Sequence, residues 1–199
     1  MAALILTLPA LVALADPETF DFKDPKGVNN VSFRLDAPLE GVNGNASGIS
    51  GKVTFDPQNP VATTGKIIVS SQSLTVPNAM QNTHLHGKMW LDSDANPEIT
   101  FEVKDLKNVK TDGDKTTADA DGTFTLKGIP KDLTIPVELT YLKDKLGERL
   151  GGQQKGDLLV IRSTFSIKRS DFGIQPGKME DKVSDTINLT VGIAGASPK

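Results

Sequence analysis

Short segments in which apolar and polar side chains alternate make up most of the chain beyond residue 16. In one of them, Val31, Phe33, Leu35 and Ala37 alternate with polar side chains. Because successive side chains of a strand point to opposite faces of a sheet, this pattern predicts a strand buried on one side only. The same alternation predicts further strands within residues 49–55, 67–69, 99–103, 124–126, 133–141, 159–167 and 183–193.

Clusters of Gly, Asn, Asp and Pro separate these segments and predict the turns between them. Pro136 lacks a backbone donor, so the strand that contains it should have an edge or a bulge there. Strands that each carry one apolar face can bury those faces in a two-sheet sandwich or in one closed barrel, so the chain is predicted to be all-β. The predicted turns are Asp56-Pro57, Asp112-Gly113, Asp121-Gly122 and Gly151-Gly152.

One stretch, Pro77–Asp92, does not alternate and predicts one or two turns of helix. Asn78 can cap the first turn with its side-chain oxygen, and Gly87 should break the stretch into two pieces. A short helix beside a barrel opening would form an adaptable apolar lid, or else a plug of the core that binds nothing. Its residues of interest are Met80, His84 and Met89 on one side, Leu85 beside them, and the only tryptophan, Trp90.

The N-terminal run Met1–Ala15 is apolar, carries no charge and ends in Ala13-Leu14-Ala15. It is shorter than the roughly 20 apolar residues that a membrane-spanning helix needs, and its small residues fit signal-peptidase cleavage before Asp16. We therefore predict a signal peptide over residues 1–15 and a mature domain over residues 16–199. The run lacks the Lys or Arg that usually begins a signal peptide, which leaves open a start upstream of Met1. A buried N-terminal helix or strand is the alternative.

Composition narrows the classes of function. A chain of 199 residues, 37% hydrophobic and 24% charged, has the size and make-up of one globular domain with a real core. The net charge of −3 argues against a nucleic-acid partner, because phosphate binding needs a concentrated surplus of Lys and Arg. The absence of Cys excludes disulfides, thiolate metal sites, iron–sulfur clusters and a cysteine nucleophile.

Two pairs of polar residues are candidates for chemistry. His84 and His86 would lie on one side of a strand, but on a helix their side chains are about 200° apart. No carboxylate is placed beside them by local spacing, so we expect no metal site. Arg169 and Asp171 end a strand, on the same face as Phe165 and Ile167, which should point inward. They would form either a polar anchor for a ligand head group or an ion pair that stabilises the turn.

Three parts of the sequence, in the same order, resemble the signature of the YceI-like family. The resemblance spans nearly the whole chain beyond residue 16. It departs at two places. Trp90-Leu91 stands where the family usually has a bulky Phe-Phe pair, and His86, a second histidine, stands where the family often has a charged residue. The matching parts are Thr83–Val103, then Gly122–Gly128 with Leu133–Val137, then Ile167–Gly173 with Val183–Asp185.

The resemblance implies an extended, eight-stranded antiparallel, lipocalin-like barrel with a short helix at one end, exported to the bacterial periplasm. It implies a lipid-binding protein, not an enzyme, whose apolar tunnel holds a long polyisoprenoid of quinone or polyprenyl type for carriage, storage or stress protection. We expect no cofactor beyond such a ligand, no nucleic-acid partner and no membrane-spanning segment in the mature chain, and a homodimer is left open. The residues expected to contact the ligand are Phe33, Met80, His84, Leu85, Met89, Trp90, Phe101, Phe124, Phe165 and Arg169.

Two other functions are alternatives. A periplasmic enzyme or metal-dependent protein would use His84 with a nearby acid. A structural or stress-protective barrel would have a core filled by its own side chains. The interior of an eight-stranded barrel is just wide enough either to be filled in this way or to hold one slender ligand.

Overall fold

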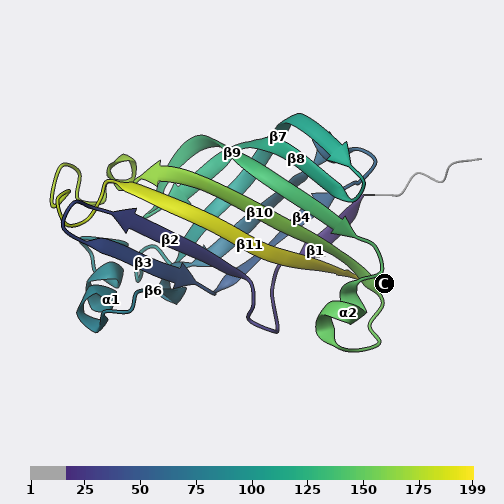
Figure 1. The fold of residues 1–199 in the computed structure, drawn as a ribbon, viewed down its shortest axis with the longest axis horizontal. Coiled ribbons are helices and arrows are strands. Elements are labelled where there is room, and N and C mark those ends of the chain that lie inside the picture. The colour runs from purple at the N-terminus through teal and green to yellow at the C-terminus, as the bar shows by residue number, and fades with distance from the viewer. Residues whose placement is uncertain (1–16) are drawn as a thin grey trace, which may run out of the picture.

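A computed structural model describes residues 17–199, so the predicted signal peptide and Asp16 lie outside the described residues. Strands make up most of the fold, and short helices lie near its two ends (Figure 1). The strands are β1 (Glu18–Asp21), β2 (Asn30–Asp36), β3 (Gly41–Ala46), β4 (Ile49–Phe55), β5 (Thr64–Ser70), β6 (Leu74–Thr75), β7 (Glu98–Asp112), β8 (Lys115–Leu126), β9 (Ile129–Leu142), β10 (Gly156–Lys168) and β11 (Thr186–Pro198). The helices are α1 (Ala79–His86) and α2 (Leu146–Leu150), with 3₁₀ turns η1 (Pro60–Ala62), η2 (Ser71–Ser73) and η3 (Arg169–Phe172).

Eight of these strands form a closed antiparallel barrel. Neighbours pair in the order β1-β4-β5-β7-β8-β9-β10-β11, and β11 pairs back with β1 where Ala196 lies opposite Asp21. The predicted eight-stranded antiparallel barrel is therefore confirmed. Strands β2, β3 and β6 continue the sheet from the other half of β11, where Leu189 pairs with Phe33, and they extend the wall at that end.

The alternating pattern predicted the positions of the long strands correctly. Seven of the eight predicted segments lie in the ring, and the eighth, residues 31–37, is β2 outside it. The pattern missed β1, which closes the ring, because a strand of four residues is too short to show alternation. The turn predicted at Asp121-Gly122 is wrong, because both residues lie within β8. Gly122 is needed there for packing, since a Cβ at this position would lie 2.5 Å from the Phe101 ring.

The expected irregularity at Pro136 is confirmed as an edge. Among the described residues, β9 and β10 pair only where Glu138–Leu142 face Leu158–Arg162. Pro136 lies beyond this ladder and is opposite Asp119 of β8 alone. Its carbonyl accepts a hydrogen bond from the Ser163 hydroxyl at 2.6 Å. The two strands therefore have no backbone ladder beyond this point, and the Ser163 hydroxyl joins them there.

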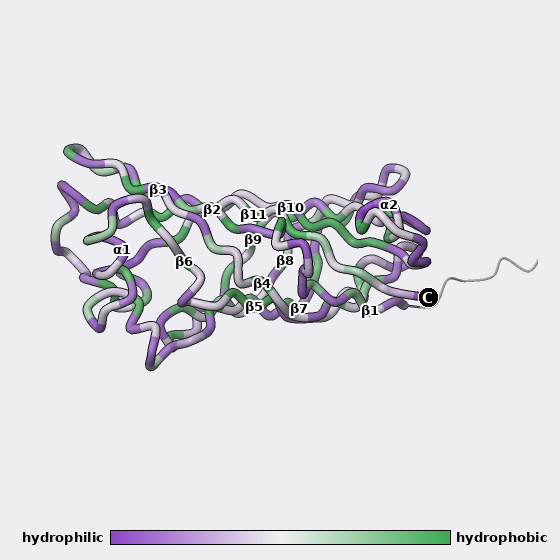
Figure 2. Tube along the Cα trace, turned by 90° about the horizontal axis from the view of Figure 1, so that it is seen from below, coloured by the Kyte–Doolittle hydropathy of each residue, from purple (hydrophilic) through white to green (hydrophobic). Residues whose placement is uncertain are grey.

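Large side chains fill the end of the barrel that carries α2. Phe20, Phe22, Phe55 and Leu146 are almost completely buried there, and the Phe20 ring lies edge-on to Tyr141 with 6.2 Å between their centroids. Figure 2 shows α2 and the C-terminus at this end and α1 at the opposite end. We call the α2 end the closed end. No helix of residues 17–199 is long and apolar enough to cross a membrane.

A buried carboxylate holds the closed end together. Asp157 is fully buried and accepts hydrogen bonds from the Tyr141 hydroxyl at 2.5 Å, from Lys199 Nζ at 2.8 Å and from the Asp144 amide at 2.8 Å. Burial alone would raise the pKa of Asp157. The ammonium of Lys199 and the other donors outweigh burial and lower this pKa to about 2. Glu18 lies beside the network, and burial together with the Asp157 carboxylate raises its pKa.

Candidate ligand-binding cavity

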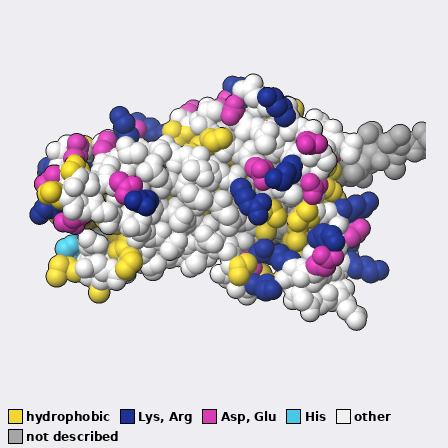
Figure 3. All heavy atoms as spheres, viewed as in Figure 1, with side chains coloured by type: hydrophobic (Ala, Val, Ile, Leu, Met, Phe, Trp, Pro, Cys, Tyr) yellow, Lys and Arg dark blue, Asp and Glu magenta, His cyan; other side chains and the backbone are white. Residues whose placement is uncertain are grey.

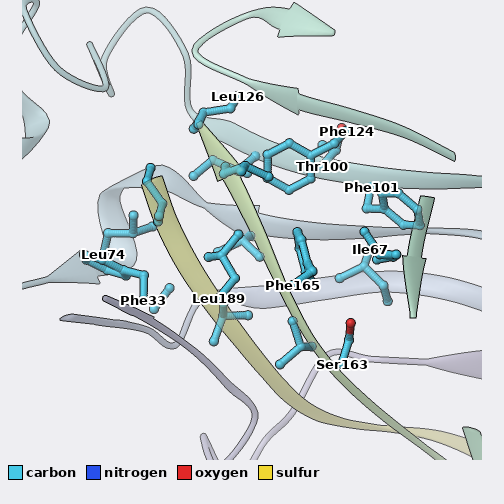
Figure 4. A pocket seen from close by; sticks show the side chains of 18 of the residues that line it. Phe33, Ile67, Leu74, Thr100, Phe101, Phe124, Leu126, Ser163, Phe165 and Leu189 are labelled. Atoms are coloured by element: carbon cyan, nitrogen blue, oxygen red, sulfur yellow. The ribbon is translucent and has the colours of Figure 1, made fainter. Parts of the chain in front are cut away.

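An elongated cavity of about 410 Å³ lies inside the barrel between the closed end and α1. Its wall is formed by the inward side chains of the barrel strands together with those of β2, β3 and β6, and nearly all of them are aliphatic or phenyl groups (Figure 4). Ile67, Phe101 and Leu189 are only half-buried although they point into the barrel. Part of their surface is therefore covered by no protein atom, so the interior of the barrel has room for a ligand.

One strand presents small residues to the interior, and one of them, Ala120, lines the cavity. Along β8 the inward positions are Ala118, Ala120 and Gly122, followed by the larger Phe124 and Leu126. Ala120 carries only a methyl group, whereas Leu106 and Ile135, which lie opposite it on β7 and β9, line the cavity with larger side chains. A small residue on β8 therefore leaves room in the wall at this position.

The four phenylalanines expected in the wall all lie there. Phe33 comes from β2, Phe101 from β7, Phe124 from β8 and Phe165 from β10, and each lines the cavity. The rings of Phe124 and Phe165 meet edge to face with centroids 6.3 Å apart, which is a favourable aromatic geometry. The inward half of the alternating pattern therefore locates the cavity wall.

Helix α1 forms where it was expected and lies across the cavity opening. The Asn78 side chain accepts hydrogen bonds from the amides of Met80 and Gln81 at 3.0 Å, and Gly87 ends the helix, so both predictions are confirmed. Gln81, His84 and Leu85 line the cavity. Residues at these spacings share one face of a helix, and this is the face that α1 turns inward.

The two methionines expected beside them lie elsewhere. Met80 and Met89 have exposed fractions of 70% and 66%, and among the described residues neither belongs to the cavity wall. Met80 precedes Gln81 by one position, a rotation of about 100° around the helix, which moves its side chain off the inward face. Trp90, which follows Met89, does line the cavity. The structure thus separates these two methionines from the other eight expected contacts.

Arg169 lines the cavity but has another role than either one expected. It is almost completely buried, and its guanidinium lies 5.9 Å from the centre of the Trp90 ring. All of its N–H groups point to backbone carbonyls of the segment 174–184, so no donor remains for a ligand head group. The carbonyls belong to Ser184, Ile174, Gln175, Lys178 and Val183.

The expected ion pair of Arg169 with Asp171 is therefore replaced by contacts to the main chain. The neighbouring carboxylate that fixes this turn is Asp185, which accepts hydrogen bonds from the amide and the hydroxyl of Ser170 at 2.9 Å each. Together these contacts hold segment 174–184 beside the cavity opening. Periodicity does not show such contacts, because they join a side chain to carbonyls many residues away.

Polar side chains line the cavity toward its open end and at three buried positions. Glu40, Gln81, His84 and Lys182 are exposed and also line the cavity, so the cavity reaches the surface beside α1. We call this opening the mouth. The sequence pattern missed Glu40, Gln81 and Lys182, because they lie in loops or on a helix face that carries no periodic signal. The buried polar groups are Thr63, Thr100 and Ser163.

The two histidines lie at the mouth in different surroundings. His84 lines the cavity, whereas the Nδ1 atom of His86 lies 3.1 Å from the Ser93 hydroxyl. Among residues 17–199 no three His, Cys, Asp or Glu side chains come close enough together to hold a metal ion. Glu40 is the acid that shares the cavity lining with His84.

Comparison with known proteins agrees with this fold. The chain is 31% identical to a UPF0312 protein of Pseudomonas aeruginosa over 76% of this chain and 72% of that protein, and 28% identical to one of Yersinia pestis over 78% and 74%. Solved structures of similar fold include BcnA of Burkholderia cenocepacia, with a TM-score of 0.67, 23% identity, and coverage of 83% of this chain and 95% of that one.

A polyisoprenoid-binding domain from Saccharophagus degradans has a TM-score of 0.65 at 10% identity, and the match covers 92% of this chain and all of that one. A YceI protein of Campylobacter jejuni gives 0.61 at 24% identity, with coverage of 78% and 84%. At these identities the structures support the fold alone. The model of the YceI-like domain matches residues 24–194, so this chain belongs to the YceI-like family.

Proposed function

We propose that this protein is an exported, non-catalytic lipid-binding protein that holds one long polyisoprenoid, of quinone or polyprenyl type, in the barrel cavity. The observation that carries the proposal is an elongated cavity with an almost wholly apolar wall that is closed at one end. A slender hydrocarbon chain fits such a wall, and each buried CH₂ group contributes about 0.8 kcal/mol. The structural neighbour described as polyisoprenoid-binding supports the same class of ligand.

The polar groups of the site fit a ligand whose chain is apolar and whose head remains near the solvent. The inward side chains around the middle of the cavity offer no charged group, and the mouth carries Glu40, His84 and Lys182. A chain would therefore enter tail first, with its head group at the mouth. The apolar run over residues 1–15 favours export and a site of action in the periplasm.

The test is to identify what the protein carries. Protein purified from an expressing bacterium is extracted with organic solvent and the extract is analysed by mass spectrometry, which should show an isoprenoid at up to one molecule per protein. Delipidated protein is then titrated with a long-chain ubiquinone, and the emission of Trp90 should change saturably because this ring lines the cavity.

A matched control keeps the titration specific. Arg34 points away from the barrel interior and pairs with Asp36 at the surface, so Arg34→Ala should give the wild-type titration curve. If the extract contains no isoprenoid and the emission of Trp90 does not respond to ubiquinone, the proposed function is wrong.

A further inference from the structure

Exposed apolar side chains gather around the mouth of the cavity. Of the described residues, the large hydrophobic side chains that are most exposed include Leu39, Met80, Met89 and Met179, with exposed fractions between 49% and 70%. We call these four residues the mouth patch. Figure 3 shows hydrophobic side chains at the end of the molecule that also carries a histidine, which is the end with α1.

Each member of the patch adjoins the cavity wall. Met179 itself lines the cavity. Leu39 precedes Glu40, Met80 precedes Gln81 and Met89 precedes Trp90, and each of these three following residues lines the cavity. The Leu39 amide also donates a hydrogen bond to the Asp181 carbonyl at 2.9 Å, which joins the two loops of the patch. The patch is therefore an apolar rim that is continuous with the apolar interior.

The side chains of the patch come from separate segments around an opening and do not form one flat face. Three are methionines, whose unbranched and flexible side chains adapt to an irregular or fluid surface. Charged residues of both signs adjoin them in the sequence: Lys88 precedes Met89, and Lys178 and Glu180 flank Met179. Because the charges are of both signs, the apolar side chains provide the main attraction to a binding surface.

We propose that the mouth patch docks the protein onto a lipid bilayer, so that the ligand passes between the membrane and the cavity without crossing water. This inference rests on the proposed function, because a water-insoluble chain that enters at the mouth must come from a lipid phase. Met80, Met89 and Leu39 enter the outer layer of the bilayer, and the mouth then opens into its hydrocarbon. Shallow apolar insertion of this kind gives reversible binding.

The patch can be removed without touching the cavity. In the variant Met80→Glu/Met89→Glu both replaced side chains are exposed and lie outside the cavity wall. The matched control is Val28→Glu/Val61→Glu, because both valines have an exposed fraction of 53% and lie outside the wall. Val28 lies at the closed end, where its amide donates to Asp24, and Asp24 pairs with Arg149 of α2.

The experiment measures sedimentation with vesicles of phosphatidylcholine and phosphatidylethanolamine that contain a long-chain ubiquinone, and the rate at which Trp90 emission reports transfer from them. The wild type and the control should sediment with the vesicles and take up ubiquinone. The patch variant should partition onto them at least about tenfold more weakly. Its affinity for ubiquinone in detergent solution should be unchanged. Raising salt from about 0.05 M to about 0.5 M should alter sedimentation little, because salt screens charges and not apolar contacts.

The possible results separate this inference from the proposed function. If the wild type does not sediment, or if the patch variant sediments as the wild type does, the docking surface is wrong although ubiquinone can still bind in detergent. If the patch variant converts a dimer of the wild type into a monomer, the patch is an interface between copies and the membrane role is also wrong. If ubiquinone does not bind in detergent and the solvent extract contains no isoprenoid, the proposed function fails, and sedimentation still reports on docking.

Discussion

Arg169 is a buried cation whose partners are main-chain carbonyls of one segment. Five N–H donors arranged in a plane can reach several carbonyls at once, which no other side chain can do. The carbonyls face inward because segment 174–184 runs over the barrel end without forming a strand. At this position the residue stabilises the rim of the mouth, and its proximity to Trp90 links the rim to the cavity wall.

Replacing Arg169 by Lys should lower the stability of the protein. Lys has three donors, so at least two of the carbonyls would remain buried without a partner, and each costs about 1–3 kcal/mol. We expect Arg169→Lys to lower the free energy of unfolding by about 2–4 kcal/mol in urea titrations. The surface variant Arg34→Lys should change it by less than about 0.5 kcal/mol. Equal effects of the two would contradict the role given to Arg169.

Asp157 should make the stability of the barrel depend on pH in acid. Its pKa is about 2 in the folded protein and 3.8 in an ordinary setting. A carboxyl whose pKa is lowered by folding contributes stability above its unfolded pKa, and this contribution is lost as the pH falls toward the folded pKa. We expect the free energy of unfolding to fall by about 2 kcal/mol between pH 5 and pH 2. This pH dependence should be absent in Asp157→Asn.

Glu18 acts in the opposite direction, because its pKa is raised from 4.5 in the folded protein. Its neutral form is the one that folding favours, so its contribution is present at low pH and is lost as the pH rises through the folded pKa. Urea unfolding at a series of pH values, for the wild type and for Glu18→Gln, separates the two groups. A profile of the Glu18→Gln variant that is flat below pH 5 would exclude this role for Asp157.

At the scale of elements, β8 contributes a small residue, Ala120, to the cavity wall. Its middle presents Ala118, Ala120 and Gly122 inward, and its far end presents Phe124 and Leu126. The sequence showed only the apolar end of this strand, because alanine and glycine carry too little apolar surface to stand out in an alternating pattern. The property that matters for the site is therefore the weakest part of the sequence signal.

Filling this space should remove binding without unfolding the protein. In Ala120→Phe the new ring enters the cavity beside Leu106 and Ile135, which lie opposite this position and also line the cavity. We expect ubiquinone binding to fall at least about tenfold, which corresponds to 1.4 kcal/mol, in Trp90 titrations. Thr123→Val, on the outward face of the same strand, is the control and should bind as the wild type does. Retained affinity in Ala120→Phe would show that the ligand does not lie along β8.

Long alternating segments predicted most of the barrel and the four phenylalanines of its wall. The alternation could not show how the ring closes, because β1 has four residues and pairs with β11 at a distance in sequence. It could not place the methionines either, since the direction of Met80 depends on the way in which α1 lies across the mouth. Two polar residues of the mouth, Glu40 and Lys182, were missed because they belong to loops, whose side chains follow no period.

At the scale of the whole molecule, the barrel has one closed end and one open end. Aromatic rings and the Asp157 network fill the closed end, whereas the other end has a cavity where a filled protein would have side chains. The apolar groups that a ligand would cover are left without contacts in the empty protein. The empty and loaded proteins should therefore differ in stability although their folds are the same.

Ligand should raise the temperature of unfolding of the delipidated protein. Binding to the folded state alone stabilises it by about 2.7 kcal/mol when the free ligand is at 100 times the dissociation constant. Differential scanning calorimetry with increasing ubiquinone should show a midpoint that rises with ligand concentration. The Ala120→Phe variant should show almost no rise, and a rise equal to that of the wild type would contradict the location of the site.

The separation of β9 from β10 has a consequence for the range of ligands. Beyond Glu138 and Arg162 these strands are joined by the hydrogen bond of the Ser163 side chain to the Pro136 carbonyl and not by a ladder of backbone hydrogen bonds. Side chains can change rotamer at a small cost, whereas a strand ladder fixes the spacing of its strands at about 4.8 Å. The width of the cavity is thus fixed near the closed end and adjustable near the mouth. We expect the protein to accept hydrocarbon chains of different thickness, saturated or branched, provided that the end of the tail fits the closed end of the cavity.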